Sequence, residues 1–203
     1  MAQRESLQPL SASQLASLET ATESYSKALT GGVPSPVVGH LQARGIDQAT
    51  AATFRLGVVN DPEPGHERYQ GMLAIPYLGK DGHAPWSLRF RCIESHDHAA
   101  HFHGKYNSLK GEATRIYNVA ALHGAGNVIH VTEGELDAVT LAMCGLSAIG
   151  APGANSWQWR HSKMLAGFSR LYIWGDPDEA GAEFVRKLQG IFRNSAVALK
   201  MPG

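Results

Sequence analysis

Cysteine is scarce in this 203-residue chain, which has two, Cys92 and Cys144. No Cys-x-x-Cys pair occurs, so neither a disulfide framework nor a zinc finger of the usual spacing is indicated. We therefore expect both cysteines to be small buried hydrophobic residues.

Long apolar runs and net charge are lacking too. No run reaches the length of a membrane span, and the first residues do not have the basic start and apolar middle of a secretory signal. We expect no membrane partner and a cytoplasmic location. Lys and Arg total 18, as do Asp and Glu, so any nucleic-acid binding must use a local basic patch.

Acidic residues follow two runs of β-branched and aromatic residues. The first run ends before Glu133, with Asp137 one helical turn later, and the second ends before Asp176 and Asp178. Such runs are typical of buried strands, and Ala/Leu/Val-rich helices follow them. Alternating strands and helices predict a parallel sheet with its ligand site beyond the carboxyl ends of the strands. Four carboxylates gathered there call for a hard cation, Mg²⁺ or Mn²⁺.

The strings Val131-Thr-Glu-Gly-Glu-Leu-Asp137 and Asp176-Pro-Asp-Glu-Ala-Gly181 resemble the two acidic motifs of the Toprim domain. DnaG-type primases, phage primase–helicases, topoisomerases, OLD-type nucleases and RecR share this domain, and the second string is most similar to the phage primase–helicase branch. The resemblance implies that Glu133 is the acid/base or metal-positioning carboxylate and that Asp137 supports it. It also implies that Glu133, Asp176 and Asp178 are the metal ligands.

The alternative interpretation is that these acids are solvated residues at helix N-termini, where the helix dipole favours negative charge. Glu135, Glu179 and Glu183 are expected on solvated helix faces, outside the site.

The strand and helix pattern predicts an α/β fold, and the resemblance implies that a parallel-sheet Toprim domain follows a smaller α+β subdomain of the primase core. The expected domains are an N-terminal helix and linker at 1–34, the α+β subdomain at 35–124, and the Toprim domain at 125–203. Helices are expected at 11–29, 37–46, 135–143, 157–165 and 179–193, with a further short helix that follows residue 46 and ends at Phe54. Strands are expected at 71–78, 86–93, 128–132, 146–149, 170–174 and 196–200.

Basic residues gather in the predicted hairpin and beyond it. Strand alternation places Arg89 and Arg91 on one face. Lys105 begins a Lys-Tyr-Asn-Ser string similar to one found in primase cores, where a lysine reaches the active site, and Lys110 follows. The resemblance implies that Lys105 is catalytic and that all four residues bind nucleotide or template. A mixed solvated face of the sheet is the alternative.

Four of the ten histidines lie in the segment Ser95–His103. These ligand types suit zinc or nickel, but the spacing matches no closed zinc site. We expect instead a pH-dependent positive charge below about pH 6.5.

The function implied by the resemblance is that of a DNA primase catalytic core, most similar to phage enzymes. Such a core makes RNA primers on single-stranded DNA from nucleoside triphosphates and works with a replicative helicase. Such primases usually carry a Cys-rich zinc module before the core, and some a helicase part after it, so site selection and processivity are expected to come from a partner or from a longer parent chain. Relatives also carry a further acidic cluster after the strand that corresponds to residues 196–200, where this sequence has Met201-Pro-Gly203, so a fragment of a longer protein or a split primase is expected. The alternatives are a Toprim nuclease of the OLD or a related ribonuclease type, and a non-catalytic RecR-like binding module.

Overall fold

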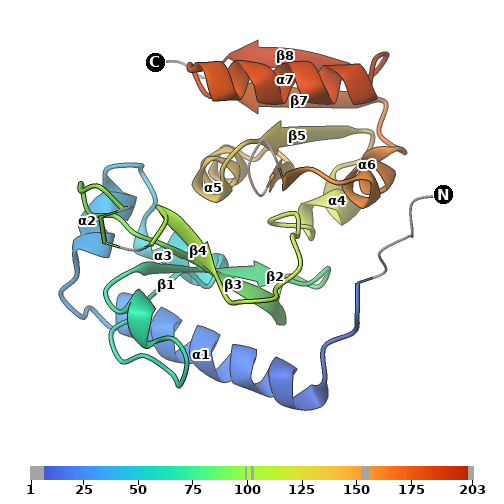
Figure 1. The fold of residues 1–203 in the computed structure, drawn as a ribbon. Helices are drawn as coiled ribbons and strands as arrows, with labels where there is room; N and C mark the ends of the chain where they lie inside the picture. The colour runs from blue at the N-terminus through green and yellow to red at the C-terminus, as the bar shows by residue number, and fades with distance from the viewer. Residues whose placement is uncertain (1–6, 99, 102, 152–155, 201–203) are drawn as a thin grey trace.

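The computed structural model describes residues 7–98, 100–101, 103–151 and 156–200. It contains two four-stranded sheets, one above the other in Figure 1. The first sheet is antiparallel, with strand order β1-β2-β3-β4, and the second is parallel, with order β6-β5-β7-β8. The predicted α/β class, with a parallel sheet after an α+β part, is confirmed. The strands are β1 (Gly57–Val58), β2 (Leu73–Leu78), β3 (Pro85–Arg91), β4 (Tyr106–Ser108), β5 (Val128–Thr132), β6 (Ala148–Gly150), β7 (Arg170–Gly175) and β8 (Ala196–Lys200).

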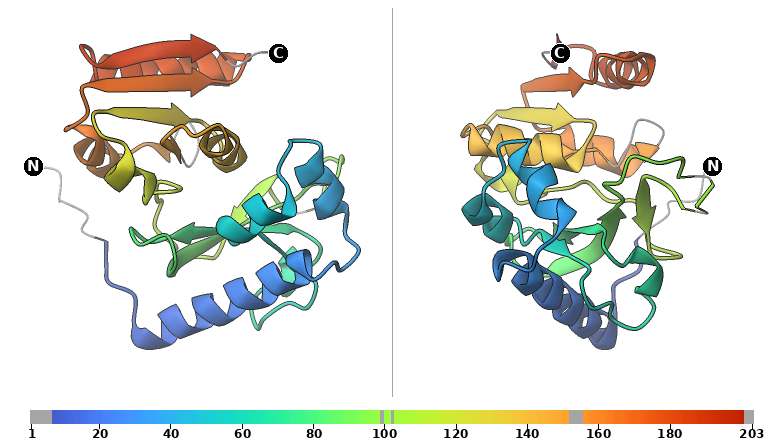
Figure 2. Two further views of the ribbon diagram at one scale, coloured as in Figure 1. Left: turned by 180° about the vertical axis from the view of Figure 1, so that it is seen from behind. Right: turned by 90° about the vertical axis from the view of Figure 1, so that its left-hand side faces the viewer.

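Helix α1 (Ala12–Thr30) runs along the antiparallel sheet, on the side away from the parallel sheet (Figures 1 and 2). Ser11 caps it in a capping box with Gln14, which satisfies backbone N–H groups that have no partner within the helix. The helix packs so closely on β1 that a Cβ at Gly57 would lie 2.5 Å from the carbonyl carbon of Tyr25. Glycine is therefore required at position 57. The buried stripe of α1 is Leu18, Ala21, Thr22, Tyr25 and Leu29.

Two short helices join α1 to the sheet, and the hairpin of β2 and β3 forms its centre. The hairpin turn contains Asp81, whose side chain accepts hydrogen bonds from the backbone N–H groups of His83 and Ala84. Gly82 has a φ of +74°, as an Asp-Gly turn requires. Strand β4 was not predicted as a strand; it pairs with the end of β3. The other elements are α2 (Pro36–Gln42), α3 (Gln48–Thr53) and the 3-10 helix η1 (Glu67–Tyr69).

Helices cover both faces of the parallel sheet. Helix α5 (Glu135–Met143) lies on the face toward the antiparallel sheet, where Leu136 and Val139 share a core with Ile75 of β2. The other face is covered by helices α6 and α7, whose buried residues form a separate core with β5 and β7. The bounds are α4 (Ala121–Gly124), α6 (Trp159–Leu165) and α7 (Glu179–Ile191).

The two sheets share the core beneath α5, and the segment that follows β4 is paired with the parallel sheet. Tyr117 forms an antiparallel bridge with Gly150, at the outer edge of β6. The domain boundaries given above stay predictions. Among the described residues, no helix is both long and apolar enough to cross a bilayer.

Candidate active site

The acidic residues that follow β5 and β7 meet at one edge of the parallel sheet. The two strands are adjacent and parallel, and Thr132 is paired with Trp174. Glu133 therefore lies beside the end of β7, where Asp176 begins the next loop. This edge is where parallel sheets place their ligand sites. The predicted carboxylates that influence one another here are Glu133, Asp137, Asp176 and Asp178.

Glu133 is half-buried and lies among like charges. Its carboxylate accepts a hydrogen bond from the backbone N–H of Asp176. Burial raises the pKa of Glu133, and the carboxylates of Asp176 and Asp178 raise it further. Its second oxygen, Oε2, is shielded from solvent and has no hydrogen-bond partner among the described residues. A divalent cation would supply that partner, so this donor set fits Mg²⁺ or Mn²⁺.

Asp137 reaches the same edge from the first turn of α5. Burial raises its pKa, and the charge of Asp176 adds to the effect. Arg44, whose Nη1 lies 3.6 Å from Asp137 Oδ1, opposes this shift. A Cβ at Gly134 would lie 2.6 Å from Asp137 Oδ2, so any larger residue there would displace this carboxylate.

The geometry of the second motif has two causes. Asp178 caps α7, because its Oδ1 accepts a hydrogen bond from the backbone N–H of Gly181 at 2.8 Å. A Cβ at Gly181 would lie 2.3 Å from the carbonyl oxygen of Asp176. Gly181 thus lets α7 pack against the backbone of Asp176. Both aspartate side chains are exposed.

Cations line the side of the site formed by the antiparallel half of the molecule, by which we mean the antiparallel sheet with α1, α2 and α3. His40 of α2 is half-buried, and its pKa is lowered by burial and then by the charges of Arg91, Arg44 and Lys105. Arg44 and Arg91 also act on Asp137, so these two cations lie next to the carboxylates. We call Arg44, Arg91 and Lys105 the basic wall. Arg91 and Lys105 are residues that the sequence predicts for the site, whereas Arg44 is not, and its only signal in the sequence is the Arg-Gly turn after α2.

Tyr106 lies between the basic wall and the acids. Arg91 donates a hydrogen bond from Nη1 to its hydroxyl at 2.6 Å, and the guanidinium groups of Arg89 and Arg91 lie 5.2 and 5.0 Å from its ring centre. Burial raises the pKa of Tyr106 to about 12, with Glu135 and Asp137 contributing. The phenol therefore stays neutral and able to donate near neutral pH.

Arg89 has a partner that the sequence analysis did not predict. Its Nη1 lies 2.6 Å from Oε1 of Glu135, which also accepts a hydrogen bond from the hydroxyl of Tyr77 at 2.7 Å. Glu135 is 1% exposed, so the expectation that it lies on a solvated helix face is wrong. The first turn of α5 points toward the antiparallel sheet, and the nearby guanidinium makes burial of the acid possible. The role of Arg89 in binding nucleotide or template stays a prediction.

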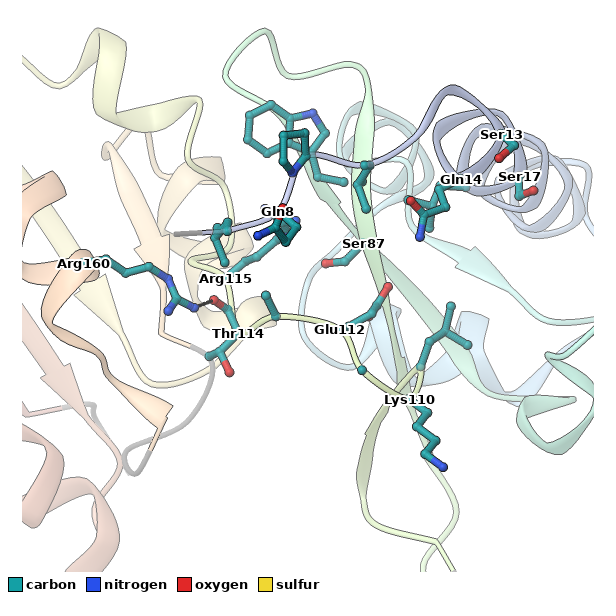
Figure 3. Close-up of a pocket in the computed structure, with 18 of the residues that line it drawn as sticks. Gln8, Ser13, Gln14, Ser17, Ser87, Lys110, Glu112, Thr114, Arg115 and Arg160 are labelled. Carbon is teal, nitrogen blue, oxygen red and sulfur yellow. Dashed lines mark hydrogen bonds between the residues drawn. The ribbon is translucent and has the colours of Figure 1, made fainter. Parts of the chain in front are cut away.

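Lys110 does not lie with the other predicted residues. It lines a groove of about 870 Å³ between the start of α1, β3 and the 109–115 segment (Figure 3). Glu112 and Arg115 line the same groove, and Arg160 of α6 closes it by donating a hydrogen bond to the carbonyl of Thr114. None of the four carboxylates belongs to its described lining. A small pocket lined by Ser87 and Arg89 continues from the groove along β3.

The His-rich segment forms a loop between β3 and β4, and Ala99 and Phe102 lie outside the described residues. Cys92 is 5% exposed, as expected, whereas Cys144 is exposed at the end of α5, so that prediction is wrong. Burial and the rings of His96 and His103 lower the pKa of His98, which works against the expected positive charge.

The geometry suits chemistry on phosphate groups. Clustered carboxylates can hold a hard cation, while the cationic side chains beside them can contact the oxygens of the same substrate. Neither half has this capacity alone, since the acids come from the parallel sheet and the cations from the antiparallel half.

The comparisons with known proteins agree with this fold. The chain is 32% identical over 137 residues to the gene 57 protein of Mycobacterium phage D29, a match of 66% of this chain and 86% of that protein. The RNA polymerase domain of Mycobacterium tuberculosis primase DnaG is similar in structure, with a TM-score of 0.74 at 19% identity over 95% of this chain and 76% of that one. A DnaG primase catalytic domain bound to ssDNA gives a TM-score of 0.65 at 16% identity, over 95% and 75%. No family model matches the chain.

Proposed function

The chain belongs to the family of the gene 57 protein of Mycobacterium phage D29 and has the fold of DnaG-type primase catalytic cores, and on that basis we propose that it is the catalytic core of a phage DNA primase. It would synthesise RNA primers on single-stranded DNA from nucleoside triphosphates, in the cytoplasm of the host and together with a replicative helicase. Its parallel-sheet part would be a Toprim domain.

One observation carries this proposal: the acidic edge (Glu133, Asp137, Asp176 and Asp178) meets the basic wall at Asp137, whose Oδ1 lies 3.6 Å from Nη1 of Arg44. Asp137 is influenced both by Asp176 and by the cations Arg44 and Arg91. A nucleotidyl transferase needs carboxylates for its cations and positive groups for the triphosphate and the template backbone. A carboxylate cluster that was only a set of solvated helix caps would not require the buried and unpartnered oxygen of Glu133.

Glu133, Asp176 and Asp178 would hold Mg²⁺ or Mn²⁺, with Asp137 supporting them from α5. When bound, such a cation neutralises the charge that develops on the phosphates and lowers the pKa of the attacking 3′-hydroxyl. The raised pKa of Glu133 also suits it to accept a proton when no cation is near.

The basic wall would orient the triphosphate against these acids. Lys105, which is exposed and directly precedes β4, would contact a phosphate. Arg91 is more constrained, because it is bonded to Tyr106, and would act as a fixed positive charge. Arg44 would be shared between Asp137 and the substrate.

Single-stranded template would follow the face of β3 toward the acids. Arg89 and Arg91 lie on the same face of that strand, where Arg91 is buried at 6% exposure and bonded to Tyr106, and the groove that contains Lys110 lies toward the other end of β3. A DnaG catalytic domain of the same fold has been solved with ssDNA, which supports a template of this kind.

The test is to supply single-stranded DNA, Mn²⁺ and labelled nucleoside triphosphates and to analyse the products by size. We expect RNA chains that depend on the template. Shortened DNA without RNA synthesis would support the Toprim nuclease alternative, which uses the same cations. DNA binding with neither product would support the RecR-like binding module.

A further inference from the structure

The loop between β3 and β4 brings a thiol and three imidazoles together. One ligand atom from each of Cys92, His96, His98 and His103 lies within 4.8 Å of the others. We propose that these four residues form a transition-metal site of the zinc class, separate from the carboxylate edge. Their types favour this metal over Mg²⁺ or Mn²⁺, because thiolate and imidazole are ligands for zinc and its neighbours, whereas Mg²⁺ takes oxygen.

The distances are close to those of a tetrahedral site. Zinc–ligand bonds of about 2.0–2.3 Å in a tetrahedron separate the ligand atoms by about 3.3–3.6 Å. Cys92 Sγ and His96 Nε2 are 3.7 Å apart, and the remaining atoms need to move inward by about 1 Å at most. Rotations of side chains in a loop suffice for that.

The nitrogen atoms have the partners that a metal site requires. His96 presents Nε2 to the thiol, while its Nδ1 lies 3.3 Å from the carboxylate of Glu94. His103 has its Nδ1 3.0 Å from the carbonyl oxygen of Gly104, which leaves Nε2 free to bind. Orienting contacts of this kind, from a carboxylate or a carbonyl to the second ring nitrogen, accompany most histidine ligands.

His98 gives independent support. Its Nδ1 is shielded from solvent and has no hydrogen-bond partner among the described residues. A buried polar atom without a partner costs free energy. The backbone also centres the loop on this residue, since the carbonyl of His98 accepts hydrogen bonds from the N–H groups of His101 and His103. A bound ion would satisfy the ring nitrogen.

The site would tie the loop to the sheet. Cys92 follows the end of β3, is 5% exposed, and donates its backbone N–H to the carbonyl of Lys105 at 2.9 Å. An ion held by Cys92 and by histidines from the loop would fix both ends of the 92–105 segment. The backbone that carries Lys105 of the basic wall would then be more rigid.

The experiment uses the full chain, purified without a polyhistidine tag and freed of metal with a chelator; one portion is dialysed against zinc and another against cobalt. We expect one zinc ion per chain, and a cobalt form that absorbs through thiolate-to-cobalt charge transfer, with the strong visible bands of a tetrahedral site. Cys92→Ser and His98→Ala should weaken zinc binding by more than about 100-fold, beyond the loss typical of an outer partner. Glu94→Gln should weaken it by about 10-fold.

Matched controls are available in the same chain. Cys144→Ser removes the exposed cysteine, and His101→Ala removes a ring that stacks on His96 at 4.3 Å but is not one of the four ligands. Both variants should keep the metal and the cobalt spectrum. His98→Ala alters a loop residue, so it tests the site even if Cys92→Ser fails to fold. Absence of zinc from wild type, or an unchanged cobalt spectrum in folded His98→Ala, would overturn the proposal.

Discussion

Arg89 of β3 and Glu135 of α5 form an ion pair at 2.6 Å that joins the antiparallel half of the molecule to the parallel half. The Glu135 side chain is 2% exposed and that of Arg89 is 22% exposed, so little water screens the contact. The pair lies beside Tyr106, between the small pocket along β3 and the carboxylates. The relative position of the two halves therefore depends on a buried charge.

Arg89→Met should destabilise the protein, because it leaves the Glu135 carboxylate buried without its cation. Removing one member of such a pair costs about 3–5 kcal/mol. Urea denaturation followed by circular dichroism measures this. The double variant Arg89→Met/Glu135→Leu should recover most of the loss, since no buried charge remains. A single variant as stable as wild type would show that the ion pair does not hold the halves together.

Lys105→Ala should lower kcat/KM for RNA synthesis by at least about 10-fold while leaving stability within about 0.5 kcal/mol, as is usual for an exposed side chain. Lys80→Ala is the matched control, because Lys80 is exposed in the β2–β3 turn. Steady-state kinetics with both variants makes the comparison. Equal values of kcat/KM for Lys105→Ala and wild type would assign Lys105 to the solvated face.

The acidic edge should make the metal-free protein less stable as pH rises. Burial and neighbouring carboxylates raise the pKa values of Glu133 and Asp137 above the ordinary 4.5 and 3.8. The folded state thus binds these protons more tightly than the unfolded state does. The stabilisation that the bound protons give to the folded state is complete below the ordinary pKa values and is lost as pH rises through the raised pKa values.

Without metal, the midpoint temperature of thermal unfolding should therefore fall more steeply between pH 4 and pH 8 for wild type than for the variant Glu133→Gln/Asp137→Asn. Mn²⁺ should restore stability in wild type only, and more at higher pH, because deprotonated carboxylates bind it. Parallel curves for the two proteins would contradict the raised pKa values.

Asp178 has two roles that substitutions can separate. Asp178→Ala removes the cap of α7, which should cost about 1 kcal/mol. Asp178→Asn keeps an acceptor for the Gly181 N–H and removes only the charge, so its stability without metal should match or exceed that of wild type. Equal stability of the Ala and Asn variants in urea denaturation would show that the cap contributes nothing.

Most of the fold could be predicted from local patterns, and the contacts between the halves could not. The runs before Glu133 and Asp176 indicate two strands of one parallel sheet, and parallel topology predicts that the acids after them meet at the same edge. That the two strands are neighbours is seen only in the structure. Glu135 was misread, since a glutamate at a helix start is usually solvated and Arg89 lies 46 residues away. The sequence does not link Cys92 to the histidines, because their spacing matches no fixed metal-binding motif. Strand β4 has three residues, too few for a periodic signal.

The most direct test of the proposed nucleotidyl-transfer centre is extension of a preformed RNA primer annealed to a DNA template, since it does not require initiation. With Mn²⁺ and nucleoside triphosphates, wild type should lengthen the primer. Asp176→Asn/Asp178→Asn, which keeps the helix cap, should fold normally by circular dichroism and extend at least about 100-fold more slowly, as expected when catalytic charge stabilisation is lost. Extension by this variant at the wild-type rate would contradict the assignment of the acidic edge as the catalytic centre.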